Sequence, residues 1–272
     1  MAVLITGAGS GIGRALAVLL LSKDARVPVI FLVGRREESL LETSSLCTST
    51  SCKTVCIIAD VASDDAPRII AAAVTAAAIR LSSVIHCAGT LGPIAPLSRV
   101  SRRDFESVMS TNLTGPVFLT SALLPLMETG SRILHISSGA AQRAIEGWGP
   151  YCISKAALNM AYRMFAIELK EQGISVGSAR PGVVETAMQE AIRKGDVEIF
   201  PDHNRFIDLH KSMETTGATT IPHPPPSTSL DTCENVAYFL AWLLSDKLSA
   251  EEFSSIEWDS RDTAHHPRWC II

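Results

Sequence analysis

The chain begins with MAVLITGAGSGIGRALAVLL, in which a short apolar run, a turn with glycines at positions 7, 9, 11 and 13, and a segment of helical spacing follow one another. The apolar run predicts a buried strand and the last segment a helix. Glycine lets the backbone turn sharply beside a ligand, and a helix start offers free amides and a positive dipole end. This order is typical of a site for a dinucleotide pyrophosphate, whereas a glycine-rich stretch alone would also fit an ordinary loop.

The same alternation of apolar runs and helical segments continues along all 272 residues, 47% of which are hydrophobic. A chain of this length can bury one large core. We expect an α/β fold: a single Rossmann-type doubly wound sheet of about seven parallel strands with helices on both faces. The expected domain spans residues 1–272, with strands near residues 2–6, 28–33, 54–59, 82–87, 131–137, 174–179 and 254–258.

Two arginines follow the second expected strand, VPVIFLVG. NAD-binding folds of this type carry an acidic residue there, which holds the ribose 2′-hydroxyl. Arg35 and Arg36 instead suit a 2′-phosphate, because a guanidinium pairs with phosphate in a forked, charge-assisted contact. The sequence therefore favours NADP(H), with Arg35 as the main contact. The alternative is that both arginines pair locally with Glu37 and Glu38.

A tyrosine and a lysine stand four residues apart in YCISK, so on a helix Tyr151 and Lys155 would share a face. A cation within about 4–6 Å lowers the pKa of a tyrosine from roughly 10, which allows proton transfer near neutral pH. Ser138 lies in the stretch RILHISSG, just after the apolar run, and would lie at the carboxyl end of a strand, the edge where open α/β sheets bind ligands. These residues predict an enzyme. Alternatively, they are a half-buried aromatic, a solvated cation and a turn residue.

With TGAGSGIG at the first turn, YCISK at 151–155 and Ser138 thirteen residues before the tyrosine, the chain resembles the classical short-chain dehydrogenases/reductases. The resemblance covers nearly the whole chain. Three further motifs agree with it: ADV with Asp60, TNLTG with Asn112, and PGVVET.

The resemblance implies a catalytic set of four residues. Tyr151 would be the general acid in carbonyl reduction, and Lys155 would lower its pKa while binding the nicotinamide ribose. Ser138 would hold the substrate carbonyl, and Asn112 would anchor a water in the proton relay.

The resemblance also implies which residues surround the NADP(H) pyrophosphate, adenine and nicotinamide carboxamide. They are Gly7, Ser10, Gly11, Ile12, Gly13, Arg35, Arg36, Asp60, Val61, Ala88, Gly89, Asn112, Tyr151, Lys155, Pro181, Gly182, Val184 and Thr186.

One segment departs from the family pattern. Where the family usually has an NNAG-like sequence, this chain has HCAG, with His86 and Cys87 in place of asparagines. Cysteine is only a weak donor, so we expect the local hydrogen bonding to change and activity to survive. We interpret Cys87 as a small buried residue rather than a redox or nucleophilic one.

Three sequences, GWGPYC, PGVVETAMQ and EWDSRD, are similar to those of the sepiapterin reductase and fungal benzil reductase group. This nearer resemblance implies that Asp259 contacts a pterin-like substrate. Trp148 would wall the substrate pocket, or alternatively pack in the core.

Residues 183–230 have an unusual composition, with four prolines between 222 and 226. We expect a substrate flap that includes a flexible Pro-rich loop. Residues 215–230 alternatively form a disordered surface loop, which the proline tract favours. The flap side chains expected to contact the ligand are Met188, Ile192, Phe200 and Phe206.

The charge and composition of the chain limit the kinds of partner that it can bind. A net charge of −4 and a pI near 6 offer no basic field for nucleic acid, and no apolar stretch has the length of a membrane span. The first strand begins at residue 2, which leaves no room for a signal peptide and predicts a cytosolic protein. Seven cysteines without CxxC spacing predict reduced thiols and no metal site, and we expect His265 and His266 to be solvated.

These observations predict an NADPH-dependent reductase of a ketone or diketone, benzil-like or pterin-like. The resemblance implies a homodimer or homotetramer that pairs through the helices bearing Asn112 and Tyr151. The alternative is a non-catalytic NADP(H)-binding sensor or scaffold on the same fold. An epimerase or dehydratase of the extended branch would need a different glycine spacing and a longer substrate domain.

Overall fold

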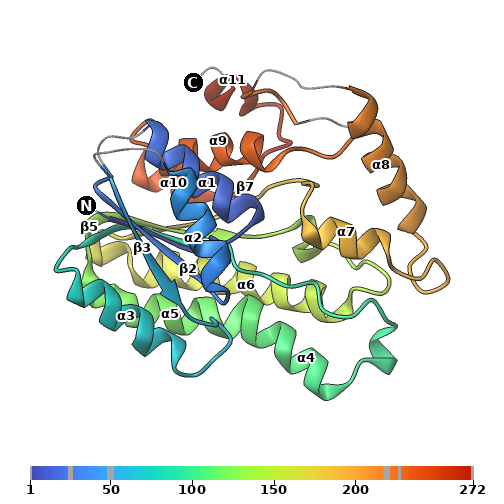
Figure 1. Cartoon of the computed structure of the whole chain (residues 1–272), viewed down its shortest axis with the longest axis horizontal. Helices are drawn as coiled ribbons and strands as arrows, with labels where there is room; N and C mark the ends of the chain where they lie inside the picture. Colours follow the sequence, from blue (N-terminus) through green and yellow to red (C-terminus); the bar gives the residue numbers. More distant parts are fainter. Residues whose placement is uncertain (1, 24–26, 48–51, 217–220, 226–227, 271–272) are drawn as a thin grey trace.

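The computed structural model describes residues 2–23, 27–47, 52–216, 221–225 and 228–270. Seven strands form one parallel sheet in the order β3-β2-β1-β4-β5-β6-β7 (Figure 1). This confirms the predicted Rossmann-type architecture. The strands are β1 Ala2–Thr6, β2 Val29–Gly34, β3 Lys53–Ile58, β4 Leu81–His86, β5 Met127–Ile136, β6 Ser175–Arg180 and β7 Glu257–Asp259.

Helices cover both faces of the sheet (Figure 1). The helices are α1 Gly11–Lys23, α2 Glu37–Leu46, α3 Ala66–Ala76, α4 Arg102–Met109, α5 Gly115–Leu123, α6 Gly149–Glu168, α7 Ala187–Arg193, α8 His203–Thr216, α9 Cys233–Leu244, α10 Ala250–Ser255 and α11 His266–Trp269. Short 3₁₀ or π turns are η1 Leu97–Arg99, η2 Ser110–Thr114, η3 Leu124–Leu126, η4 Gly139–Ala141 and η5 Lys170–Gln172.

The two helical layers explain why the central strands are apolar throughout. One core cluster joins the sheet to α1, α9 and α10, and a second joins it to α3, α5 and α6. Every residue of β1 is buried as a result. A strand covered on both faces reads as a continuous apolar run rather than an alternating one, which is the pattern seen in the sequence.

The strand order reverses between β1 and its neighbours β2 and β4. In open α/β sheets, ligands bind beside the carboxyl ends of the strands at this switch point. The glycine turn after β1 and the segment after β4 both lie there, so the fold itself selects this edge for a site.

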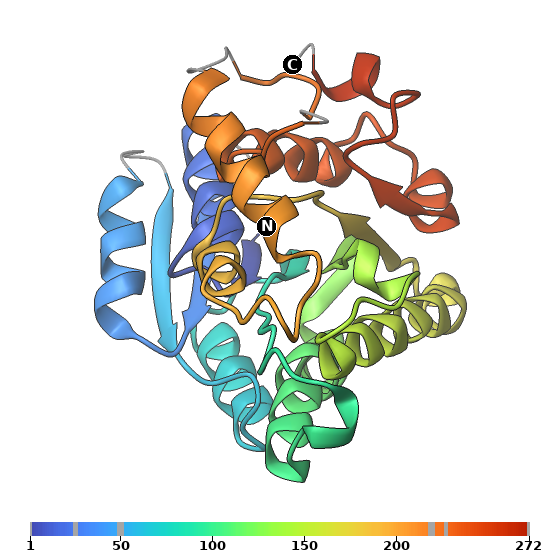
Figure 2. The same ribbon diagram turned by 90° about the vertical axis from the view of Figure 1, so that its right-hand side faces the viewer.

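The segment 183–230 contains two helices, α7 and α8, which stand in front of the sheet in Figure 2. A third core cluster packs their side chains against Trp148 and Tyr151. The flexible loop expected in this segment lies partly outside the described residues, at 217–220 and 226–227. Within the described part, the backbone N–H of His223 donates to Asn235 Oδ1 and its carbonyl accepts from Asn235 Nδ2.

Among the helices of the described residues, none combines the length and apolar character that crossing a membrane requires.

Candidate active site

The glycine turn brings helix α1 close to the end of strand β1. Gly7 has a φ of +68°, a conformation that favours glycine. A Cβ on Gly13 would lie only 2.5 Å from the Gly7 carbonyl oxygen. The amides at the start of α1 therefore open toward the cleft without side-chain obstruction, and a cradle of this shape fits a pyrophosphate.

A cleft of about 940 Å³ runs along the carboxyl edge of the sheet and includes this turn. It brings together the predicted catalytic and substrate residues Ser138, Tyr151, Lys155, Trp148, Met188 and Asp259. Its lining also includes the predicted cofactor contacts Gly7, Ser10, Gly11, Ile12, Gly13, Arg35, Arg36, Asp60, Val61, Ala88, Gly89, Pro181, Gly182, Val184 and Thr186. Of the predicted catalytic and cofactor residues, Asn112 is the one that does not line it.

At the end of the cleft beside β2, Arg35 forms an ion pair with Asp60, with 3.9 Å between Nη1 and Oδ2. The Arg35 side chain is 76% exposed, so a pair of this length in solvent is weak. Asp60 is held in place because its Oδ1 accepts from the backbone N–H of Ala62 at 3.1 Å. The Arg35 guanidinium thus remains free to turn toward an anionic ligand group.

Helix α6 buries Tyr151 and Lys155 side by side at the centre of the cleft. Lys155 Nζ lies 5.8 Å from the centre of the Tyr151 ring and donates to the carbonyl oxygen of Ile136 at 2.8 Å. Ile136 ends β5, and Ser138 follows it, where its hydroxyl oxygen accepts from the backbone N–H of Ala140 at 3.2 Å. The strand end and the helix therefore fix the three side chains together.

Burial changes the acidity of both groups. Burial raises the pKa of Tyr151, and a hydrogen bond with Ser138 acts in the opposite direction. Burial lowers the pKa of Lys155 to about 8. The expected lowering of the Tyr151 pKa by the lysine is therefore not what the structure gives, because desolvation of the phenolate prevails. Tyr151 is a neutral phenol at physiological pH and can donate a proton.

Asn112 lies on the π turn η2 and is completely buried. Its Oδ1 accepts from the backbone N–H of Thr90 at 2.8 Å, and its Nδ2 donates to the Thr90 carbonyl at 2.8 Å and to Ser154 Oγ at 3.0 Å. These contacts tie the segment after β4 to helix α6. In the structure the Asn112 side chain holds these elements in position, and its predicted role in anchoring a relay water stays a prediction.

The unusual HCAG segment is held by a residue that sequence reasoning missed. Thr6 Oγ1 accepts from the backbone N–H groups of Cys87 and Ala88, each at 3.1 Å. Burial raises the pKa of Cys87 to about 12, so its thiol stays protonated. This agrees with a small buried residue rather than a nucleophile.

His86 forms a buried pair with His135 of the adjacent strand, with ring centres 4.7 Å apart. Its Nε2 also contacts Thr120 Oγ1 at 2.8 Å. Burial lowers the pKa of His86 to about 3 and that of His135 as well. Both rings are neutral and belong to the packing between the sheet and α5.

Aromatic and aliphatic side chains wall the other end of the cleft. Trp148 both lines it and packs in the third core cluster, so the two alternatives for this residue hold together. Met188, Ile192 and Phe206 also line the cleft. Phe200 does not: it is fully buried behind Trp148, with ring centres 5.3 Å apart.

Asp259 reaches the cleft from the end of β7, but both of its carboxylate oxygens already have partners. Oδ2 pairs with Arg180 Nη2 at 3.1 Å, and Oδ1 accepts from the backbone N–H of Arg261 at 3.0 Å. The structure thus gives Asp259 a supporting position. Sequence reasoning missed the cleft-lining polar residues Gln142, Arg143, Arg180, Arg205 and Arg261, which come from loops and element ends without a motif.

The carboxyl-terminal histidines are not solvated as expected. His265 packs against Trp258 with ring centres 4.7 Å apart and pairs with Asp262 at 3.4 Å. His266 Nε2 contacts the carbonyl oxygen of Ser260 at 2.9 Å. Within the described ranges, no group of three or more His, Cys, Asp and Glu residues is placed to hold a metal ion.

Comparisons with known proteins agree with this geometry. Residues 1–197 match the family model of the short chain dehydrogenases. A benzil reductase ((S)-benzoin forming) of Bacillus cereus is 31% identical over 218 residues, which cover 76% of this chain and 85% of the relative. A sepiapterin reductase of Chlorobaculum tepidum is 32% identical over 192 residues, covering 68% and 78%. The two predicted kinds of relative are thus both found, although this benzil reductase is bacterial rather than fungal.

Solved structures show the same fold. The KRED1-Pglu enzyme is 28% identical, with a TM-score of 0.76 over 92% of this chain and 98% of that chain. A short chain dehydrogenase of Shigella flexneri, crystallised with NADP, has a TM-score of 0.75 at 24% identity over 96% of each chain. Sequence, fold and site geometry together show that the chain belongs to the short chain dehydrogenase family.

Proposed function

We propose that this oxidoreductase is an NADPH-dependent carbonyl reductase that acts on a ketone or diketone, with a benzil-like or pterin-like carbonyl compound as substrate. The observation that carries the proposal is the buried, neutral Tyr151 phenol, which lies with Ser138 and Lys155 in the cleft that the glycine turn also lines. A phenol of this kind can give its proton to the oxygen of a reduced carbonyl.

Each residue of the site would have a separate role in the reaction. When bound, the nicotinamide supplies the hydride for the carbonyl carbon. Ser138 and Tyr151 would both donate hydrogen bonds to the carbonyl oxygen, and Tyr151 would transfer its proton there as negative charge develops. Lys155, 5.8 Å from the ring centre, would stabilise the resulting phenolate. That attraction is stronger in a water-excluded site than in solvent.

The preference for NADPH rests on Arg35 and Arg36. Both line the cleft after β2, and among the described residues the ion-pair partner of Arg35 is Asp60, through a long, exposed contact. A 2′-phosphate placed between them would receive charge-assisted hydrogen bonds from a guanidinium. NADH lacks this group and would lose those contacts.

The proposal also includes the domain organisation and the cellular location of the protein. Residues 1–272 act as one domain in which 183–230 is the substrate flap. All seven cysteines are free thiols, which suits the cytosol.

The test compares wild type with Tyr151→Phe, which removes the proton donor and keeps the ring. Consumption of NADPH, and separately of NADH, is followed by absorbance with sepiapterin, benzil and small diketones. We expect turnover with NADPH that falls by about 10²–10⁴-fold in the variant. If NADPH binds tightly but no carbonyl compound is reduced, the protein is a non-catalytic NADP(H)-binding sensor instead.

A further inference from the structure

The substrate end of the cleft carries an excess of arginines. Four of them line it, and Asp259 is the acidic residue that lines it there. The arginines belong to separate parts of the chain: the loop after η4, the end of β6, helix α8 and the turn after β7. They are Arg143, Arg180, Arg205 and Arg261.

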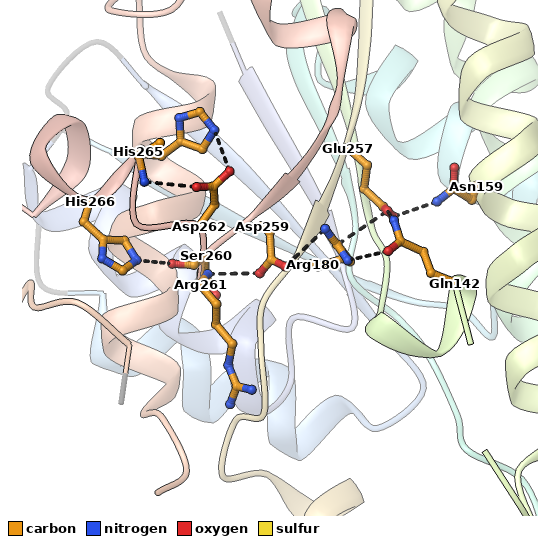
Figure 3. A network of polar contacts seen from close by, with 11 residues as sticks. Gln142, Asn159, Arg180, Glu257, Asp259, Ser260, Arg261, Asp262, His265 and His266 are labelled. Atoms are coloured by element: carbon orange, nitrogen blue, oxygen red, sulfur yellow. Dashed lines mark hydrogen bonds and ion pairs between the residues drawn. The ribbon is translucent and has the colours of Figure 1, made fainter. Parts of the chain in front are cut away.

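Arg180 has its charge satisfied by acids of β7 (Figure 3). It pairs with Asp259 at 3.1 Å and with Glu257 at 3.5 Å, and its Nη1 donates to Gln142 Oε1 at 2.8 Å. Gln142 and Asn159 in turn donate to Glu257 at 2.9 and 2.8 Å. This network uses the acids that could otherwise neutralise the remaining arginines.

Arg261 is held in the turn by its backbone and leaves its guanidinium free. Its N–H donates to Asp259, while the preceding Ser260 N–H donates to the carbonyl of Arg180 at 3.0 Å and the Ser260 carbonyl contacts His266. In Figure 3 the Arg261 side chain points away from this network. Its Nε is buried without a hydrogen-bond partner, and the guanidinium forms no ion pair with any residue in the described ranges.

The guanidinium of Arg261 lies beside the backbone that leads into the flap. A Cβ on Gly182 would approach its Nε to 3.1 Å. Burial lowers the pKa of Arg261, the charge of Asp259 opposes this, and the charges of Arg205 and Arg143 act in the same direction as burial, which places these cations near one another. Three cations here face one lining carboxylate, Asp259, which also pairs with Arg180. Such an excess of like charge in a partly buried cleft is costly, and an anion would relieve that cost.

The nearby acids do not supply that anion. The charge of Asp231 acts on Arg261, but Asp231 is buried behind the cleft and its carboxylate accepts from Asn235 and Thr232. Arg205 is paired with Asp202 only at 3.9 Å and in solvent.

Trp148 and Phe206 line the same end of the cleft with aromatic surface. On the basis of the proposed reductase function, we propose that the substrate is an aromatic carbonyl compound that carries an anionic group, a carboxylate or a phosphate, and that Arg261 binds this group together with Arg143 and Arg205. A guanidinium fork matches either anion, and the aromatic walls would hold the ring while Tyr151 and Ser138 hold the carbonyl.

The test measures kcat/KM with NADPH for acids and their neutral counterparts at constant ionic strength. The acids are benzoylformate, 3-acetylbenzoate, 4-acetylbenzoate and 4-acetylphenyl phosphate, which place the charge at different distances from the carbonyl. Methyl esters of the carboxylic acids and 4-methoxyacetophenone are the neutral partners. The series is run with wild type, Arg261→Gln, Arg143→Gln and Arg205→Gln, and with Arg68→Gln on α3 as the matched control outside the cleft.

We expect wild type to prefer at least one acid over its neutral partner by roughly ten- to a hundredfold. This ratio should fall toward one in Arg261→Gln and persist in Arg68→Gln. Whether the carboxylate or the phosphate gives the larger ratio identifies the anion. If Arg261→Gln is unstable, the exposed Arg143→Gln and Arg205→Gln variants should show the same loss in part.

Two results would overturn the inference. One is reduction of benzil and the neutral ketones with no preference for any acid. The other is an Arg261→Gln variant that binds NADPH more weakly, by fluorescence titration, while its acid preference is unchanged, since Arg261 would then serve the cofactor. Failure to reduce any compound, benzil included, would instead contradict the proposed reductase function.

Discussion

Burial decides the protonation of the residues at the centre of the site. The sequence spacing of Tyr151 and Lys155 correctly predicted that they share a helix face, but spacing carries no information on desolvation. In the structure, burial keeps Tyr151 protonated and brings the pKa of Lys155 down to about 8. Tyr151, the proposed proton donor, is therefore protonated at neutral pH, and of these two residues the one whose pKa lies near neutrality is the lysine.

This gives a prediction for the pH profile of reduction. Lys155 is charged below its pKa of about 8 and neutral above it. Because a neutral amine cannot stabilise the Tyr151 phenolate, kcat/KM should fall as pH rises through about 8. The profile of kcat/KM reports groups of the free enzyme. Lys155→Arg, whose guanidinium stays charged, is the control and should lack this descending limb. A wild-type profile that stays flat to well above pH 9 would contradict it.

At the scale of secondary structure, apolar runs predicted where the strands lie. Strand ends that fall in polar segments were predicted less well. The expected strand at 131–137 begins earlier, at Met127, because Met127 already pairs with Leu81. The pairing then resumes at Arg132 after an irregular polar stretch, in which Ser131 Oγ accepts from the Glu128 N–H. The expected strand at 254–258 is only Glu257–Asp259, because the preceding residues complete α10. Such differences arise from local polar contacts, which hydrophobic periodicity does not record.

In the site, too, some residues could be predicted from sequence motifs and others could not. Motifs identified the cleft-lining residues of the glycine turn and of α6, because the placement of those residues depends on local geometry. Thr6 and Arg261 had no such signal: one is an ordinary strand end, and the other acts through a turn that only tertiary pairing places in the cleft. Asn112 carried a motif, but its burial under Thr90 was not readable from it.

The connection between η2 and its neighbours gives a second prediction. Asn112→Ala would leave the backbone N–H and carbonyl of Thr90 without their partners in a buried site. It would also remove the amide group that donates a hydrogen bond to Ser154 Oγ. We expect it to lower the free energy of unfolding by about 2–4 kcal/mol, measured by urea denaturation, and to lower kcat with it. Thr114→Ala, an exposed neighbour on the same turn, should have little effect. Lost activity with unchanged stability would instead favour the predicted water relay.

At the scale of the whole molecule, two helices present large apolar side chains to solvent. Phe118 lies on α5, and Met160, Met164 and Ile167 share one face of α6; these residues are between 48% and 72% exposed. Apolar groups gathered in this way are typical of an interface. A stable interface buries roughly 800 Å² on each partner, which two helices can supply.

We therefore expect a homodimer or homotetramer that pairs through α5 and α6. Light scattering after size exclusion should give two or four times the chain mass of 29.2 kDa for wild type. The double variant Met164→Glu, Ile167→Glu should lower the measured particle mass toward that of one chain, because the new charges would be buried at the interface without partners. Ile69→Glu, an exposed apolar position on α3, is the control. A wild-type particle of one chain would contradict this assembly.

The position of β7 has a consequence for how such an enzyme changes over evolution. Among the described strands, β7 pairs with β6 alone and lies at the edge of the sheet. The turn after it can thus acquire or lose residues without breaking any other strand pairing, and it carries Arg261 into the cleft. Residues 1–197, which match the family, hold the glycine turn and Tyr151, the proposed proton donor. Arg261 and the proposed proton donor therefore reside in separate stretches of chain, so selection or a laboratory graft can replace the turn after β7 while the glycine turn and Tyr151 stay intact.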